Sequence, residues 1–444
     1  MKKKLFIPLA FILCLLPFIF NIPLEVKKGL SILIFTAVLW ITEALPLPVT
    51  SLLVPILASL LGILSVKAAF SSFAHPIIFL FFGGFALATA LKKYEMDKFI
   101  AYKIVSASKG SLFTTSLLLF AATAFVSMWI SNTSTTAMML PLALGIIGAV
   151  QADERLKTFL LLGIAYSASV GGIGTLVGSP PNGITAANLN MSFTDWLIFG
   201  IPTVIVLFPL LFLILYFYFK PNLKEKVTLE KISFSMTKER WNVLGIFLLT
   251  ALLWLFGKKI SSLFGIHHYF DALVAVLAVV LLFLANLVNW EEINEGTDWG
   301  TLYLFGGGIA LSHVLKTTGA SKFIASLLTN SIGNLPHLLI VLCVTLFMIF
   351  MTELMSNTAT AAIFVPILIT TATQMGLPPH ELALPAGIAA SCAFMLPVAT
   401  PPNAIVYGTG AIKQKDMIKA GFVLNISFAV VITLLTVFII NRTI

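Results

Sequence analysis

Long apolar runs recur along the 444-residue chain, and they limit what it can fold into more than any other feature. Examples are residues 5–20, 204–219, 241–256, 272–287 and 422–440. A helix needs roughly 20 apolar residues to cross the hydrocarbon core of a bilayer. These runs are continuous, whereas the strands of a membrane barrel alternate apolar and polar residues. The sequence therefore predicts an all-α polytopic membrane protein surrounded by lipid.

The distribution of charge supports this prediction. Charged residues make up 10% of the chain, against roughly 25% in an average soluble domain, which excludes an ordinary soluble enzyme. The net charge is +9, but the basic residues gather in loops, as expected for cytoplasmic loops of a membrane protein. The charge therefore indicates orientation and does not call for a nucleic-acid partner. These basic loop segments are residues 2–4, 92–109, 155–157, 220–240 and 413–419.

Counting spans from the basic N-terminus gives a topology. The start lacks a small-residue cleavage site, so we expect a retained first span rather than a signal peptide. We expect a multi-pass protein of the bacterial inner membrane, with the N-terminus in the cytoplasm and the C-terminus outside. It would have about 11 crossing helices of membrane-spanning length. They begin near Leu5, Gly29, Val49, Pro76, Lys157, Trp196, Trp241, Asp271, Gly300, Glu381 and Gly421.

The chain also repeats itself. Ser131-Asn132-Thr133 returns as Ser356-Asn357-Thr358, and a hydroxyl residue, Ser127 or Thr352, stands four positions before each serine. Residues 178–182 (Gly-Ser-Pro-Pro-Asn) return as residues 399–403 (Ala-Thr-Pro-Pro-Asn), and Phe-Gly-Gly at 82–84 returns at 305–307. Three motifs in one order at nearly one offset indicate two homologous halves. Inverted repeats of this kind are common in transporters.

Two segments carry the Ser-Asn-Thr motifs between apolar arms, residues 111–150 and 336–375. Each is either two full spans or one re-entrant hairpin. We favour hairpins, because that topology keeps the basic loops on the cytoplasmic side. The resulting domains are a scaffold part (1–110) and a transport part (111–220) of the first repeat, a cytoplasmic linker (221–240), and a scaffold part (241–335) and a transport part (336–444) of the second repeat.

The two Pro-Pro motifs predict broken helices at 179–182 and 400–403, because proline supplies no N–H and clashes with the preceding turn. Irregular backbone at membrane depth is tolerated only where protein buries it or it lines a cavity. Freed carbonyls suit cations, and the available ligands are neutral oxygens that suit Na⁺. We therefore predict two or more Na⁺ sites. The predicted ligands are Ser127, Ser131, Asn132 and Gly178 in the first half, and Thr352, Met355, Asn357 and Ala399 in the second.

A substrate site is predicted between the two hairpin tips. Its residues would be Asn132, Thr133, Ser179, Asn357, Thr358, Thr400 and the adjacent Pro401. No Lys or Arg lies near these motifs in the sequence, so an anion would need bound cations and helix N-termini to balance its charge. Two related clusters of uncharged polar groups fit a small molecule with an anionic group at each end, such as a four- or five-carbon dicarboxylate.

These motifs resemble the divalent anion/sodium symporters, which include the INDY-type dicarboxylate transporters. The resemblance covers essentially the whole chain and includes a signature around the second Pro-Pro loop. It implies an elevator-type homodimer, the Na⁺ and substrate residues named above, and carboxylates more than sulfate, with succinate, fumarate and malate leading. The signature residues are Ser391, Phe394, Pro397, Val398, Ala399, Asn403, Ile405 and Val406.

Alternatives remain at this stage. The same ligands serve Na⁺ symport and dicarboxylate exchange, and the fold also suits a sulfate or tricarboxylate carrier. Glu353, three residues before the second motif, has Met128 as its counterpart, so we expect a structural role rather than proton coupling. Glu43 is expected to be structural too. An intramembrane enzyme would need a nucleophile with a base or a metal cluster, and a channel would need filter rings, and neither pattern is present.

Overall fold

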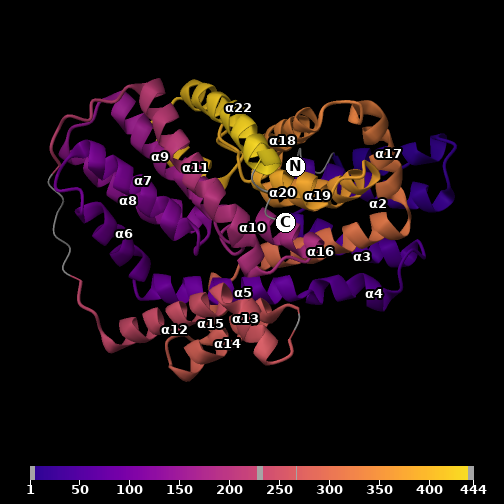
Figure 1. The fold of residues 1–444 in the computed structure, drawn as a ribbon, viewed down its shortest axis with the longest axis horizontal. Helices are drawn as coiled ribbons and strands as arrows, with labels where there is room; N and C mark the ends of the chain where they lie inside the picture. The colour runs from indigo at the N-terminus through magenta and orange to yellow at the C-terminus, as the bar shows by residue number, and fades with distance from the viewer. Residues whose placement is uncertain (1–5, 228–233, 267, 439–444) are drawn as a thin grey trace.

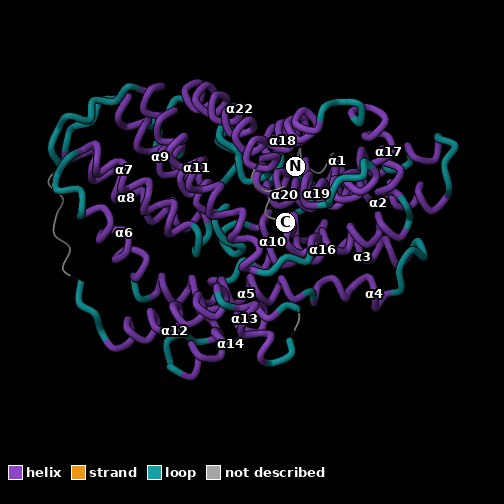
Figure 2. Tube along the Cα trace, viewed as in Figure 1, coloured by secondary structure: helices purple, strands orange, loops and turns teal. Residues whose placement is uncertain are grey.

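The computed structural model describes residues 6–227, 234–266 and 268–438, and the regular structure among them is helical (Figure 2). The basic residues 2–4 and part of the predicted linker lie outside these residues. The first half contains α1 (Phe6–Leu13), η2 (Leu16–Ile19), α2 (Leu24–Thr42), α3 (Leu47–Leu60), α4 (Val66–Ser71), η3 (Ser72–Ala74), α5 (Pro76–Lys93), α6 (Met96–Ser106), α7 (Leu112–Ser127), α8 (Asn132–Ala149), α9 (Glu154–Gly172), α10 (Pro180–Leu189) and α11 (Phe193–Phe219). The second half contains α12 (Lys238–Leu255), α13 (Gly257–Leu263), α14 (Phe270–Leu284), α15 (Trp290–Gly296), α16 (Trp299–Thr317), α17 (Ala320–Ile332), α18 (His337–Leu354), α19 (Asn357–Gln374), α20 (His380–Ala389), α21 (Pro401–Tyr407) and α22 (Gln414–Phe438).

Several helices are long and apolar enough to cross a membrane. Within the described residues, four pass this test by length and composition, and a fifth does if the bent pair α12 and α13, which meet at 80°, counts as one span. Nine of the eleven predicted helix starts lie within three residues of an observed start, whereas α2 and α22 begin five and seven residues before the predicted Gly29 and Gly421. The full number of crossings stays a prediction. The four helices are Val66–Lys93, Phe193–Phe219, His337–Leu354 and Gln414–Phe438.

The two motif-bearing segments form helical hairpins. In the first, α7 and α8 are joined at residues 128–131, and in the second, α18 and α19 are joined at residues 355–356. Hydroxyl side chains set where the first hairpin's arms begin: Ser111 caps α7 by accepting from the Thr114 N–H, and Ser131 caps α8 by accepting from the Ser134 N–H. In Figure 1 the first hairpin, α7 and α8, lies at the left of the molecule, and the second, α18 and α19, lies right of the centre.

The helix breaks lie slightly earlier in the chain than predicted. The non-helical stretches are residues 173–179, between α9 and α10, and residues 390–400, between α20 and α21. The Pro-Pro pairs do not form the breaks but open the next helices, with Ser179 and Thr400 as their N-caps. The physical reason is that the first turn of a helix has no use for the missing N–H of proline, and its fixed φ suits that position.

The halves interlock around these breaks. The first-half helix α10 packs on α19 and α20 of the second half, and the second-half helix α21 packs on α8 and α9 of the first. Outside this body, α5 packs against α14, and α3 against α16. The second segment of each broken helix therefore packs against the hairpin of the other half. As a result, both breaks lie between the two hairpin tips.

Candidate functional site

A cavity of about 860 Å³ lies where the hairpin tips and the helix breaks meet. Of the residues nominated from the sequence, all except Ser127 and Thr352 line it. These two are fully buried behind the wall. The lining nominees are Ser131, Asn132, Thr133, Gly178, Ser179, Met355, Asn357, Thr358, Ala399, Thr400 and Pro401.

The two buried hydroxyls make equivalent contacts. Ser127 Oγ donates to Asn132 Oδ1 at 2.7 Å, and Thr352 Oγ1 donates to Asn357 Oδ1 at the same distance. The Thr352 hydroxyl also lies 2.8 Å from the Ala390 carbonyl oxygen. In each hairpin, the last turn of the first arm is therefore hydrogen-bonded to the first residue of the second arm. This bond fixes the position of the asparagine amide oxygen at the hairpin tip.

Helix ends surround the cavity in an ordered way. The helix N-termini that open onto it include those of α8, α10, α19 and α21, at Asn132, Pro180, Asn357 and Pro401. Each such end carries roughly half a positive charge from the helix dipole and favours an anion. The C-terminal ends of α7, α9, α18 and α20 lie at the hairpin tips and the breaks. Carbonyl ends favour cations, so the site offers environments of both signs.

The first break is packed so closely that one position requires glycine. An ideal Cβ on Gly172 would lie 2.4 Å from Asn132 Oδ1 and 3.0 Å from the Gly178 carbonyl oxygen. These two oxygens therefore converge on the space in front of Gly172. Both belong to the predicted first Na⁺ site, and neutral amide and carbonyl oxygens are ligands that suit Na⁺. Sequence reasoning missed Gly172, because a glycine among several others gives no signal of its own.

The asparagines of the two Pro-Pro-Asn motifs were also missed as functional residues. Asn182 Nδ2 donates to the Gly172 and Thr175 carbonyls, and Asn403 Nδ2 donates to the Ala393 and Leu396 carbonyls. Each amide thus binds carbonyls that the helix break has freed. The duplication of the motif was the available signal for this role.

Some nominated hydroxyls have other partners. Ser131 Oγ donates to Ser134 Oγ at 3.1 Å, and Ser179 Oγ lies 3.1 Å from Ser391 Oγ, joining the two halves. Thr400 Oγ1 accepts from the Asn403 N–H. These contacts hold the wall of the cavity in shape, and they place Ser391, one of the signature residues, directly behind Ser179 of that wall.

Glu353 makes a structural contact behind the second tip. Its carboxylate accepts from the backbone N–H groups of Phe394, Met395 and Leu396 at 2.6, 2.8 and 3.1 Å, and from Asn425 Nδ2 at 2.8 Å. Four donors converge on this carboxylate, and its loss would leave three buried backbone N–H groups unpaired. The geometry favours the structural role expected from the sequence over proton coupling.

The electrostatic character of the cavity is set by polar neutral groups and carboxylates. Among the described residues that line it, none is Lys or Arg, whereas Glu43, Asp298 and Glu353 are present. Glu43 ends α2 in the left-handed region, with φ of 48°, and lies on the cavity wall. Within the described residues no group of three His, Cys, Asp or Glu side chains is arranged to hold a metal ion.

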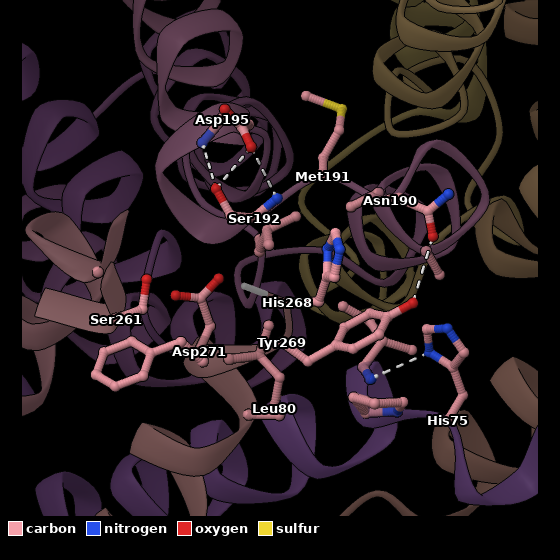
Figure 3. Close-up of a pocket in the computed structure, with 18 of the residues that line it drawn as sticks. His75, Leu80, Asn190, Met191, Ser192, Asp195, Ser261, His268, Tyr269 and Asp271 are labelled. Carbon is pink, nitrogen blue, oxygen red and sulfur yellow. Dashed lines mark hydrogen bonds between the residues drawn. The ribbon is translucent and has the colours of Figure 1, made fainter. Parts of the chain in front are cut away.

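A second, smaller cavity of about 220 Å³ lies at the far end of the first broken helix (Figure 3). Here residues 190–195, which comprise the connection from α10 and the first turn of α11, meet the unit formed by α12, α13 and α14. Asp195 pairs with Lys258, the Phe193 N–H donates to Asp271 Oδ2 at 2.7 Å, and Tyr269 donates to Asn190 Oδ1 at 3.3 Å. We call this contact region the seam.

The sequence of the whole chain is similar to that of known transporters. The chain matches the family model described as the sodium:sulfate symporter transmembrane region over residues 1–441. It is 51% identical over 424 residues to an uncharacterized transporter of Haemophilus influenzae, covering 93% of this chain and 92% of the relative. It is 36% identical over 475 residues to the sodium-dependent dicarboxylate transporter SdcS of Staphylococcus saprophyticus, covering 98% and 90%.

Solved structures with the same fold have diverged far in sequence. The YdaH transporter of Alcanivorax borkumensis matches with a TM-score of 0.62 at 15% identity, covering 87% of this chain and 88% of that one. The MtrF protein of Neisseria gonorrhoeae matches with a TM-score of 0.56 at 13% identity, covering 86% and 85%.

The interlocked hairpins, the paired helix breaks and the apolar spans define an all-helical membrane transporter. The family match over nearly the whole chain makes the assignment specific. The chain belongs to the sodium:sulfate symporter family, which also contains the divalent anion/sodium symporters that its motifs resemble, and it is a transporter rather than an enzyme.

Gly172→Ala tests the tight packing of the first break. A methyl group there would meet Asn132 Oδ1 and the Gly178 carbonyl, and overpacking of this kind costs about 1–3 kcal/mol. We expect a lower unfolding temperature for the purified protein in detergent. The matched control is Gly145→Ala in α8, where a Cβ meets nothing within 4 Å, so that the unfolding temperature should hold or rise. Equal stability of the two variants would contradict the described geometry.

Proposed function

We propose that the protein is a sodium-coupled symporter of four- and five-carbon dicarboxylates, with succinate, fumarate and malate as the leading substrates. The observation that carries the proposal is a cavity bordered by several helix N-termini, those of α8, α10, α19 and α21 among them, with no Lys or Arg among its described lining residues. A dianion is costly at membrane depth unless its charge is balanced. Helix N-termini supply part of that balance, and bound cations supply the rest.

Two Na⁺ ions would bind as co-substrates, one in each half. The first would take oxygens of Ser127, Ser131, Asn132 and Gly178, and the second those of Thr352, Met355, Asn357 and Ala399. The dicarboxylate would lie between them, against Asn132, Thr133, Ser179, Asn357, Thr358, Thr400 and Pro401. Asn132 and Asn357 belong to both sets, so a cation bound on Oδ1 orients the same amide toward the anion. The relatives named sodium-dependent dicarboxylate transporter support this choice of substrate.

We further propose an orientation and a conformational state. If the basic segments face the cytoplasm, α2 would end and α16 would begin on the cytoplasmic side. Glu43, Asp298 and Thr301 stand at these helix ends and line the cavity, so this part of its wall would lie on the cytoplasmic side too. The cavity would then open inward. The transport parts 111–220 and 336–444 would move across the membrane against the scaffold parts, as an elevator, within a homodimer in the inner membrane.

Exchange without net symport, or transport of sulfate or a tricarboxylate, would use the same fold. The pair of equivalent amide and hydroxyl clusters favours a substrate with two anionic ends, since sulfate would need only one cluster. Whether the empty carrier can reorient separates symport from exchange, and flux measurements decide it.

Uptake of labelled succinate into proteoliposomes tests the proposed function. We expect saturable uptake driven by an inward Na⁺ gradient, which collapses when choline or K⁺ replaces Na⁺, because the dianion then loses its balancing charge. In the control, the vesicles are preloaded with unlabelled succinate and no Na⁺ gradient is applied. Uptake of labelled succinate under these conditions would indicate exchange. Uptake that is indifferent to Na⁺ but follows a proton gradient would overturn the proposal.

Cross-linking across the seam tests the proposed movement. Asp195 and Lys258 form an ion pair between the transport part and the scaffold part, and such a contact must break if one part slides past the other. With cysteines at both positions on a cysteine-free background, a short bifunctional thiol reagent should abolish uptake that is present before treatment.

The matched control pair is Lys93 and Glu292, an ion pair of 2.6 Å that lies wholly within the scaffold parts. The same reagent on cysteines at these positions should leave uptake unchanged. Undiminished uptake after complete cross-linking of the 195–258 pair would show that the seam does not open during transport.

A further inference from the structure

We propose that Asn182 and Asn403 are positioning residues for the two cation sites, and that their side-chain amides set the affinity for Na⁺. This inference rests on the proposed function and adds to it two residues outside the ligand and substrate sets. Both side chains are completely buried, and neither lines the central cavity. They act through the backbone carbonyls that they hold.

The contacts of Asn182 define the role in the first half. Its Nδ2 donates to the Gly172 carbonyl at 2.8 Å and to the Thr175 carbonyl at 2.7 Å. Gly172 is the last residue of α9, and Thr175 lies inside the non-helical stretch. One amide therefore ties the end of the helix and the middle of the break to the first turn of α10.

Asn403 makes the equivalent contacts in the second half. Its Nδ2 donates to the Ala393 carbonyl at 3.0 Å and to the Leu396 carbonyl at 3.1 Å. The partners stand ten and seven residues before the asparagine in both halves. The same pair of bonds occurs twice in one chain at corresponding positions, so the contact belongs to the repeated architecture and is not an accident of one loop.

The amides act only as donors. Asn182 Oδ1 and Asn403 Oδ1 are both buried and accept no hydrogen bond within the described protein. A buried acceptor without a partner is unfavourable, so an apolar side chain of similar size would be the cheaper choice if packing alone mattered. The two N–H groups of each amide are thus the feature that the position requires.

The held carbonyls adjoin the predicted ligands. A Cβ built on Gly178 would lie 2.6 Å from the Gly172 carbonyl oxygen, and one built on Gly172 would lie 3.0 Å from the Gly178 carbonyl oxygen. The Gly178 carbonyl is a predicted ligand of the first ion, and Ala399 is its counterpart in the second half. When Asn182 holds the break, the Gly178 carbonyl stays beside Asn132 Oδ1 in front of Gly172. By the repeat, Asn403 would do the same for the Ala399 carbonyl. Without the amide the carbonyls of the break repel one another and spread.

The inference is tested by measuring the unfolding temperature of the purified full-length protein in detergent over a series of Na⁺ concentrations. Choline replaces Na⁺ to keep the ionic strength constant. Groups that orient ion ligands typically change affinity by roughly 10- to 100-fold, so we expect Asn182→Ala and Asn403→Ala each to raise the half-saturating Na⁺ concentration by at least about tenfold. Asn182→Leu, which fills the site without donors, should do the same and covers the case in which the alanine variant does not fold.

The matched control is Asn188→Ala. Asn188 lies in the same helix as Asn182 and bonds to the Ile184 carbonyl and to Ser312, away from the break. It should keep the wild-type Na⁺ dependence. A wild-type Na⁺ dependence in folded Asn182 and Asn403 variants would overturn the positioning role alone. A wild-type protein whose unfolding temperature ignores Na⁺ would overturn the proposed function, and the positioning role with it.

Discussion

Backbone groups that leave a helix inside a membrane have no water to bind, and the rest of this structure depends on how the protein satisfies them. Two stretches, 173–179 and 390–400, interrupt helices between the hairpin tips. Their carbonyls are held by Asn182 and Asn403, and the N–H groups of the second stretch are held by Glu353. Asn182 and Asn403 belong to the helices that follow the breaks, and Glu353 belongs to α18, so these partners lie in the same half as the break that they hold.

The same constraint accounts for the chemistry of the site. Once the helices are interrupted, their carbonyl ends and their N–H ends face a common cavity, and the protein gains regions of opposite polarity without placing a basic side chain at membrane depth. Cations would settle against carbonyl, amide and hydroxyl oxygens, and an anion against helix N-termini and the bound cations. Transport of the anion would then be coupled to the cations directly, because the anion would bind weakly until the cations have bound.

Much of this architecture could be predicted from the sequence, because repetition and helix-breaking motifs are local signals. The hairpins and most helix starts were found in this way. The breaks were placed too late, since proline was taken as the break itself and not as the first residue of the following helix. Gly172, the asparagine amides and the seam between Phe193 and Asp271 were not found. Each depends on which distant segments pack together, and a single sequence does not carry that information.

The central claim is that bound cations balance the charge of the anionic substrate, and equilibrium binding tests it most directly. The dissociation constant of succinate for the purified protein is measured over a series of Na⁺ concentrations at constant ionic strength. Linkage requires that ions bound together with the substrate tighten its binding, so with two coupled ions the dissociation constant should fall about a hundredfold for a tenfold rise in Na⁺ below saturation. A dissociation constant that does not change with Na⁺ would contradict the account.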